Sequence, residues 1–219
     1  MVNKIRNGIV WVRTPKCATT TMAVHLKRFC EWKKIKYTPH DNHGVMAPTH
    51  FVNLGHLYSG DVNWDIVLGE GRGIMASIRN PLERFLSHYK HHLRENRYEE
   101  FKEDVSAFYL HNYKRINFEQ MFLGMNNYMC KYLGVGGDEG WNVDILNKRY
   151  DYFSVADKFE QSLNKFEKLT GYKFKEKDLI ENKTDNNLII TDEFVEFFKE
   201  NNKQDYELYN YVLDIYGYK

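Results

Sequence analysis

The sequence has few cysteines, no long apolar run and almost no net charge, and each absence excludes a class of protein. Three widely spaced cysteines in 219 residues do not form a disulfide framework or a zinc motif, which favours a reducing cytoplasm. A net charge of +1 argues against a dedicated nucleic-acid binder. No apolar run approaches the roughly 18 residues of a membrane span, and the first residues, MVNKIRNG, lack the apolar region of a signal peptide. We therefore expect a soluble, cytoplasmic protein with neither a membrane nor a nucleic acid as partner.

What the chain does have is the composition of an ordinary globular protein. Apolar residues make up 42% and aromatic residues 16% of the sequence. A chain of this length is long enough to bury a sizeable core. We predict one domain over residues 1–219.

The most informative stretch is residues 8–28, GIVWVRTPKCATTTMAVHLKR. Its apolar run, Ile9 to Val12, is typical of a strand buried on both faces. A polar break with Pro15 and Lys16 follows, and then a helical pattern whose first turn carries three threonines. We expect this helix to end near residues 31–34.

A loop of this kind, delivering a lysine and hydroxyl groups to a helix N-terminus, suits an anion such as phosphate. The first N–H groups of a helix have no partner within it and carry partial positive charge. The loop is not a Walker A motif, because GxxxxGK[ST] is absent and Lys16 precedes the small residues. The alternative interpretation is a helix capped by a threonine after a strand, with no ligand.

A second strand-to-helix turn lies at residues 73–89. Residues 73–78 predict a strand, and Asn80, Pro81 and Glu83 predict a helix start with an asparagine cap and a capping box. The helix carries an apolar stripe at helical spacing: Leu82, Phe85, Leu86, Tyr89 and Leu93. Arg79 ends the strand, and Ser87 follows it by eight residues.

The two turns are expected to meet at one edge of a parallel sheet, because ligands in open α/β sheets bind outside the carboxyl ends of the strands. Two anion sites would then face one nucleotide. The remaining pattern predicts short strands at 35–38 and 150–155, a long loop at 39–64, a flexible connection at 134–140, and helices at 99–110, 118–133, 158–169, 191–201 and 204–216. Thr191 is the predicted cap of the helix at 191–201.

The two motifs resemble those of sulfotransferases that use 3′-phosphoadenosine 5′-phosphosulfate (PAPS). PKCATTT, residues 15–21, resembles the 5′-phosphosulfate loop, and RNPLERFLSHY, residues 79–89, resembles the 3′-phosphate motif. The resemblance implies an α/β, P-loop-like three-layer sandwich with a central, mostly parallel sheet, flanking helices and a helix-rich C-terminal half. The cofactor-binding residues it implies are Lys16, Cys17, Ala18, Thr19, Thr20, Thr21, Arg79 and Ser87.

The resemblance also implies the reaction, which is sulfuryl transfer from PAPS to an acceptor hydroxyl, without a metal. Lys16 would neutralise the leaving group. Related enzymes place a catalytic histidine between the two motifs, commonly after glycine, so His56 of Gly55-His56 is the expected general base and His50 the second choice. The C-terminal pattern, with an Asn-Lys-Thr loop, resembles the carbohydrate branch that includes heparan sulfate 2-O-sulfotransferase, and Lys183 is a further candidate for the nucleotide pocket.

Two other interpretations of the nucleotide site remain open. One is a P-loop-like kinase that uses the first loop for ATP, and the other is a nucleotide-binding module without catalysis. The acceptor is expected among carbohydrates, phenols and small alcohols. His88, His91 and His92 form a cluster that we predict to lie on a solvated face, because an i, i+4 pair supplies too few ligands for zinc.

Overall fold

The structure is a computed structural model, and a defined part of the chain is described in it. The described residues are 9–34, 37–38, 51–53, 68–69, 71, 73–94, 104–106, 109, 126–136, 140–175, 188 and 190–218. The predicted loop at 39–64, with His50 and His56, lies almost wholly outside them, as do Lys183 and most of the predicted helix at 99–110.

In the described part of the chain, five parallel strands form the sheet at the centre of the fold, in the order β2-β3-β1-β4-β5. Its strands are β1 (Ile9–Val12), β2 (Tyr37–Thr38), β3 (Phe51–Asn53), β4 (Gly73–Ile78) and β5 (Tyr152–Val155). Every residue of β1, β4 and β5 is buried, as a strand covered by helices on both faces requires. The predicted α/β class and parallel sheet are confirmed.

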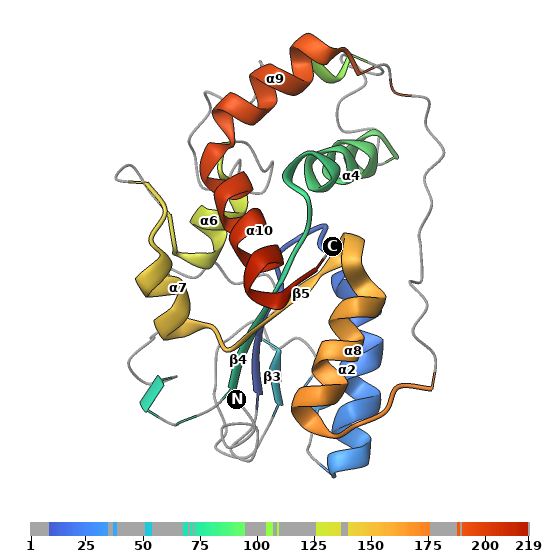
Figure 1. The fold of residues 1–219 in the computed structure, drawn as a ribbon. Helices are drawn as coiled ribbons and strands as arrows, with labels where there is room; N and C mark the ends of the chain where they lie inside the picture. The colour runs from blue at the N-terminus through green and yellow to red at the C-terminus, as the bar shows by residue number, and fades with distance from the viewer. Residues whose placement is uncertain are drawn as a thin grey trace.

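One face of the sheet is covered by α2 (Thr19–Lys33) and α8 (Phe159–Thr170), which lie side by side in Figure 1. Side chains alternate between the two faces along a strand, and Trp11, Met75 and Tyr152 are neighbours in register on this face. They pack with apolar side chains of the two helices, among them Met22, Leu26, Phe29, Phe159, Leu163 and Phe166.

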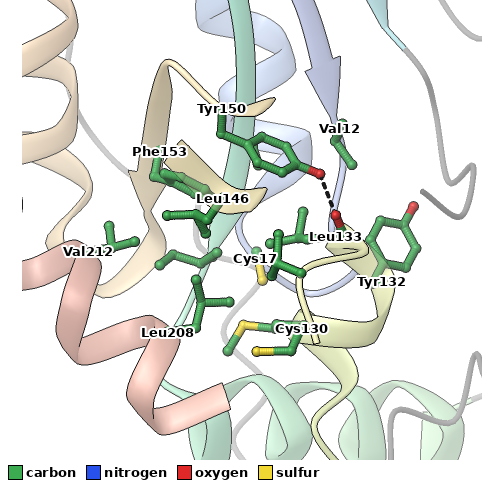
Figure 2. Packing of buried hydrophobic residues seen from close by; sticks show 14 of the residues in the cluster. Val12, Cys17, Cys130, Tyr132, Leu133, Leu146, Tyr150, Phe153, Leu208 and Val212 are labelled. Carbon is green, nitrogen blue, oxygen red and sulfur yellow. Dashed lines mark hydrogen bonds between the residues drawn. The ribbon is translucent and has the colours of Figure 1, made fainter. Parts of the chain in front are cut away.

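The opposite face is covered by α6 (Tyr128–Leu133), α7 (Val143–Arg149) and α10 (Lys203–Tyr216). Val12, Ala76 and Phe153 are in register there. Buried apolar side chains of the strands and these helices form a cluster on this face. Figure 2 shows that Leu208 and Val212 of α10 lie near Phe153, and that the Tyr150 hydroxyl donates to the Leu133 carbonyl at 2.8 Å. The helices on both faces confirm the predicted three layers.

A chain of side-chain hydrogen bonds crosses the sheet from β1 to β5. The indole Nε1 of Trp11 donates to Ser77 Oγ at 3.0 Å, and Ser77 Oγ is hydrogen-bonded to Ser154 Oγ at 2.7 Å. All three side chains are buried. Buried polar groups are costly without partners, so these bonds disfavour any shift in the register of the three strands.

Beyond the sheet, α4 (Pro81–Arg94) and α9 (Asp192–Asn201) enclose a separate aromatic cluster. Phe85, Tyr89, Phe194 and Phe198 belong to it. The Thr191 side chain accepts the Phe194 N–H at 3.2 Å and so caps α9, as the sequence predicts.

Four features differ from the prediction. The strand β3, Phe51–Asn53, lies within the predicted loop at 39–64. The chain turns at Asn126 and Asn127, which both have positive φ, so α6 begins only at Tyr128 and does not continue the predicted helix from residue 118. The helix α7 was not predicted, although Asn142 caps it by accepting the Ile145 N–H at 2.9 Å. Tyr150 ends α7 and is not part of the strand.

The N-termini of α6 and α10 cap each other. Asp205 of α10 is 1% exposed, and its carboxylate accepts the N–H groups of Met129 and Cys130 at 3.0 and 2.8 Å. In return, Asn127 Oδ1 accepts the Gln204 N–H at 2.9 Å. Burial raises the pKa of the Asp205 carboxyl, and these two N–H groups oppose that rise. A single carboxylate thus supplies the acceptors for the first turn of another helix.

We expect Asp205→Ala to lower the free energy of unfolding by about 3 kcal/mol, because it leaves two buried N–H groups without an acceptor. Chemical denaturation measures this change. Asp192→Ala is the matched control, since Asp192 is exposed in the first turn of α9 and its loss is expected to cost no more than about 1 kcal/mol. Equal losses in the two variants would contradict the capping role.

Candidate active site

The loop between β1 and α2 has an unusual backbone. Lys16 and Ala18 both have positive φ, 66° and 53°, in a region that non-glycine residues rarely adopt. The Cys17 N–H between them donates to the Thr14 carbonyl at 3.3 Å. Alternation of left-handed and right-handed residues turns successive N–H groups toward one point, which makes a concavity for anions.

The N-cap of α2 is Ala18, not a threonine, and the N-cap residue makes no side-chain hydrogen bond to the helix. The first helical bond runs from the Met22 N–H to the Ala18 carbonyl at 3.0 Å. The N–H groups at the start of the helix therefore lack carbonyl acceptors within it. The alternative of a threonine-capped helix is wrong, and the predicted hydroxyls do lie in the first turn.

The three threonines differ in exposure. Thr20 is exposed, whereas Thr19 and Thr21 are 7% and 2% exposed. Successive helical residues point about 100° apart, so one small anion cannot meet all three side chains equally. Of the three threonines, Thr20 is therefore the residue most accessible to a ligand.

Cys17 faces the protein core. Its side chain is 1% exposed, and the thiol lies 3.7 Å from the Pro15 carbonyl oxygen. Burial raises the pKa of this thiol to about 12, so at neutral pH it is not a nucleophile. Figure 2 shows Cys17 among the buried apolar side chains of the cluster drawn there, close to Leu133 of α6. Only its backbone is available for the predicted cofactor-binding role.

Arg79 and Asn80 form the turn between β4 and α4. The Arg79 side chain is 28% exposed, and its Nη2 lies 3.4 Å from Glu83 Oε2. Arg79 Nε is buried and has no hydrogen-bond acceptor among the described residues. An exposed ion pair of this kind contributes little, so a phosphate could replace it at small cost.

Asn80 caps α4, as predicted, but the capping box does not form. Asn80 Oδ1 accepts the N–H groups of Leu82 and Glu83 at 3.1 and 3.3 Å. A capping box needs Glu83 to accept the Asn80 N–H. That N–H donates instead to Asp157 Oδ1 at 3.0 Å, and Glu83 contacts Arg79.

The two predicted turns lie at the same edge of the sheet. β1 and β4 are hydrogen-bonded in parallel, with Val12 opposite Ala76, and the loop follows the first strand as Arg79 follows the second. The positive charges of Arg84 and Arg79 both act on the Cys17 thiol and lower its pKa against the larger effect of burial. The loop and the arginine turn are therefore within electrostatic reach of each other.

The helix α4 carries the other predicted residue of this site, Ser87, which is partly buried. Arg84 is 1% exposed and lies over the Tyr128 ring at 4.4 Å, which fixes α4 against α6. His88 is 4% exposed, so the prediction of a solvated face is wrong for this residue. The reason is that α4 is covered on more than one side, by α9 and by α10.

Asp157 and Tyr209 also belong to this edge, and the sequence did not reveal them. Asp157 follows β5 in a short 3-10 helix, η3 (Ala156–Lys158), and Tyr209 comes from α10. The Tyr209 hydroxyl donates to Asp157 Oδ2. The sequence does show Asp157 as a polar residue just after a predicted strand. It does not show the partner, because Tyr209 lies 52 residues farther along the chain.

In the described part of the chain, no group of His, Cys, Asp and Glu side chains is arranged to hold a metal ion. The predicted base His56, its alternative His50 and the candidate Lys183 lie outside the described residues. The site as described is thus a strand-to-helix loop with a concave backbone and Lys16, beside an arginine turn after the neighbouring strand.

A model of the sulfotransferase family matches residues 1–212. The chain therefore belongs to the sulfotransferase family, whose general reaction is sulfuryl transfer to an acceptor. Searches of curated proteins and of solved structures gave no significant match. None of the helices in the described ranges is both long enough and apolar enough to cross a membrane.

We expect opposite effects from two substitutions of Ala18. Ala18→Gly raises the free energy of unfolding by about 1 kcal/mol, because glycine adopts positive φ without steric cost. Ala18→Val lowers it by about 2 kcal/mol, because a β-branched residue is strained there. Thermal or chemical unfolding measures both.

Ala23→Gly, in the interior of the same helix, is the matched control. There φ is helical, and glycine is expected to lower the free energy of unfolding by about 1 kcal/mol. The same sign for Ala18→Gly and Ala23→Gly would contradict the left-handed conformation of residue 18.

Proposed function

We propose that this sulfotransferase moves the sulfuryl group of PAPS to a hydroxyl of an acceptor, with carbohydrates as the favoured acceptor class. The observation that carries the proposal is the parallel pairing of β1 with β4, which brings the Lys16 loop and the Arg79 turn to one edge. PAPS has anionic groups at both ends of its ribose, and two adjacent anion sites match that distribution. We also propose that residues 1–219 form one domain.

The donor groups at this edge fit such a nucleotide. The concave loop and the start of α2 offer backbone N–H groups and the Thr20 hydroxyl, which suits a 5′-phosphate. Arg79 offers a planar, permanently charged guanidinium whose Nε is buried without an acceptor among the described residues. In this proposal the loop, residues 16–21, holds the 5′ end, and Arg79 with Ser87 holds the 3′-phosphate.

When bound, PAPS supplies the sulfuryl group and leaves as adenosine 3′,5′-bisphosphate. The contribution of the chain is position and charge, as in phosphoryl transfer. Lys16 stabilises the negative charge that develops on the leaving phosphate oxygen. The acceptor oxygen forms a bond to sulfur as the bond from sulfur to the bridging oxygen breaks, and no metal is needed.

The acceptor hydroxyl must lose its proton during this transfer, and we propose His56 as the general base. Imidazole is the side chain best suited to take a proton near neutral pH. The proposal rests on the position of Gly55-His56 between the two motifs and on the resemblance to sulfotransferases, with His50 as the alternative.

We expect adenosine 3′,5′-bisphosphate at about one hundred times its Kd to raise the melting temperature by about 5–10 °C, because a ligand of the native state stabilises it. The shift is expected to disappear in Arg79→Ala and to persist in Arg28→Ala, an exposed arginine on α2. A thermal-shift titration beside ATP with magnesium makes the comparison. A shift with ATP and none with the bisphosphate would overturn the proposal in favour of a kinase.

His56→Ala is expected to reduce kcat by at least about 100-fold, because general-base catalysis is lost, while bisphosphate binding stays unchanged. A transfer assay with PAPS and a carbohydrate acceptor panel measures the first, and the thermal-shift titration measures the second. His50→Ala is the matched control. Full activity in His56→Ala with loss in His50→Ala would move the role of base to His50.

A further inference from the structure

Asp157 stands opposite Asn80 because of the register of the sheet. β4 and β5 are parallel, with Ile78 opposite Val155. Asn80 and Asp157 each lie two residues beyond this last pair, just after the strands end. The Asn80 N–H donates to Asp157 Oδ1 at 3.0 Å, so the pairing of the two segments continues past the end of the sheet through a side chain.

The other carboxylate oxygen of Asp157 is held by α10. The Tyr209 hydroxyl donates to Oδ2, and Tyr209 is 6% exposed. Burial, and then this hydrogen bond, raise the pKa of Tyr209, so the phenol stays protonated and remains the donor at neutral pH. Asp157 therefore joins three segments: η3, which follows β5, the turn after β4, and the helix α10, which Figure 1 shows across the sheet from α8.

The residue held by this carboxylate is the one that directly follows Arg79. The peptide between Arg79 and Asn80 is planar, so fixing the Asn80 N–H also fixes the plane that carries the Arg79 carbonyl. A capping box would otherwise have taken this N–H, and Glu83 is thereby left to contact Arg79 at 3.4 Å. The negative charge of Asp157 would itself repel a nearby phosphate, so its benefit to such a site is geometric.

We propose that Asp157, supported by Tyr209, is a positioning residue that sets the Arg79 turn for a 3′-phosphate and so determines the preference for a 3′-phosphorylated nucleotide. This inference rests on the proposed function, since it assigns Arg79 to the 3′-phosphate. Asp157 does not contact the nucleotide in this scheme and acts through Asn80.

The test is the ratio of two dissociation constants, for adenosine 5′-phosphate and for adenosine 3′,5′-bisphosphate, measured by calorimetry on the full chain. The two ligands differ only in the 3′-phosphate. Asp157→Ala is expected to lower this ratio about three- to tenfold, mainly through weaker bisphosphate binding, which corresponds to the loss of one charge-assisted hydrogen bond. A residue that only stabilises the fold would lower the melting temperature and leave the ratio unchanged.

Asp151→Ala is the matched control, because Asp151 makes the same kind of contact at the opposite end of the same two strands. Its Oδ2 accepts the Ile74 N–H at 2.9 Å. This variant is expected to lose stability and keep the ratio. Asp157→Asn retains an oxygen for the Asn80 N–H and is expected to keep most of the preference, whereas Tyr209→Phe is expected to lose part of it.

The outcomes separate the inference from the proposed function. If the unaltered protein shows no preference for the bisphosphate, the proposed function fails. If it shows the preference and Asp157→Ala keeps it, the inference alone is overturned. Tighter bisphosphate binding in both Asp157→Asn and Asp157→Ala would also overturn it, because charge repulsion would then outweigh positioning.

Discussion

The register of β1, β4 and β5 is the constraint on which the other features depend. The hydrogen bonds from Trp11 to Ser77 and from Ser77 to Ser154 cross all three strands inside the core. A shift by one residue would turn each strand's side chains to the wrong face and leave these buried groups without partners. The same register places the Lys16 loop beside the Arg79 turn, and Asp157 opposite Asn80.

Local strain and tertiary support are combined at the site. Two non-glycine residues of the first loop have positive φ, which is costly unless the surroundings hold them. The buried Cys17 side chain anchors this loop in the apolar cluster between the sheet and the helices α6, α7 and α10. The second turn is held by the carboxylate of Asp157, in η3, and by a tyrosine from α10. The backbone of the proposed anion site is thus held in shape by the fold itself, which would reduce the entropy cost of binding.

Patterns with a local cause were predicted well, and patterns with a distant cause were not. The run Ile9 to Val12, the Asn80 cap and the Thr191 cap each depend on a few adjacent residues, and the structure confirms them. His88 lies outside the apolar stripe of its own helix, and an i, i+4 pair supplies too few ligands for zinc, so the sequence predicts a solvated face; its burial comes from helices far along the chain. The capping box failed because Asp157, 77 residues away from Asn80, took the N–H it needed.

The sequence by itself determined the strand-to-helix turns, the residues they carry and, through the family to which the chain belongs, the sulfuryl transfer reaction. These depend on short-range preferences: apolar runs, caps and the N–H groups at a helix start. Only the tertiary structure decided that Cys17 turns inward, that Asp205 caps α6, and that Asp157 holds Asn80. In each case several groups could occupy the same buried position or accept the same N–H. The folded chain determines which of them lies close enough to do so.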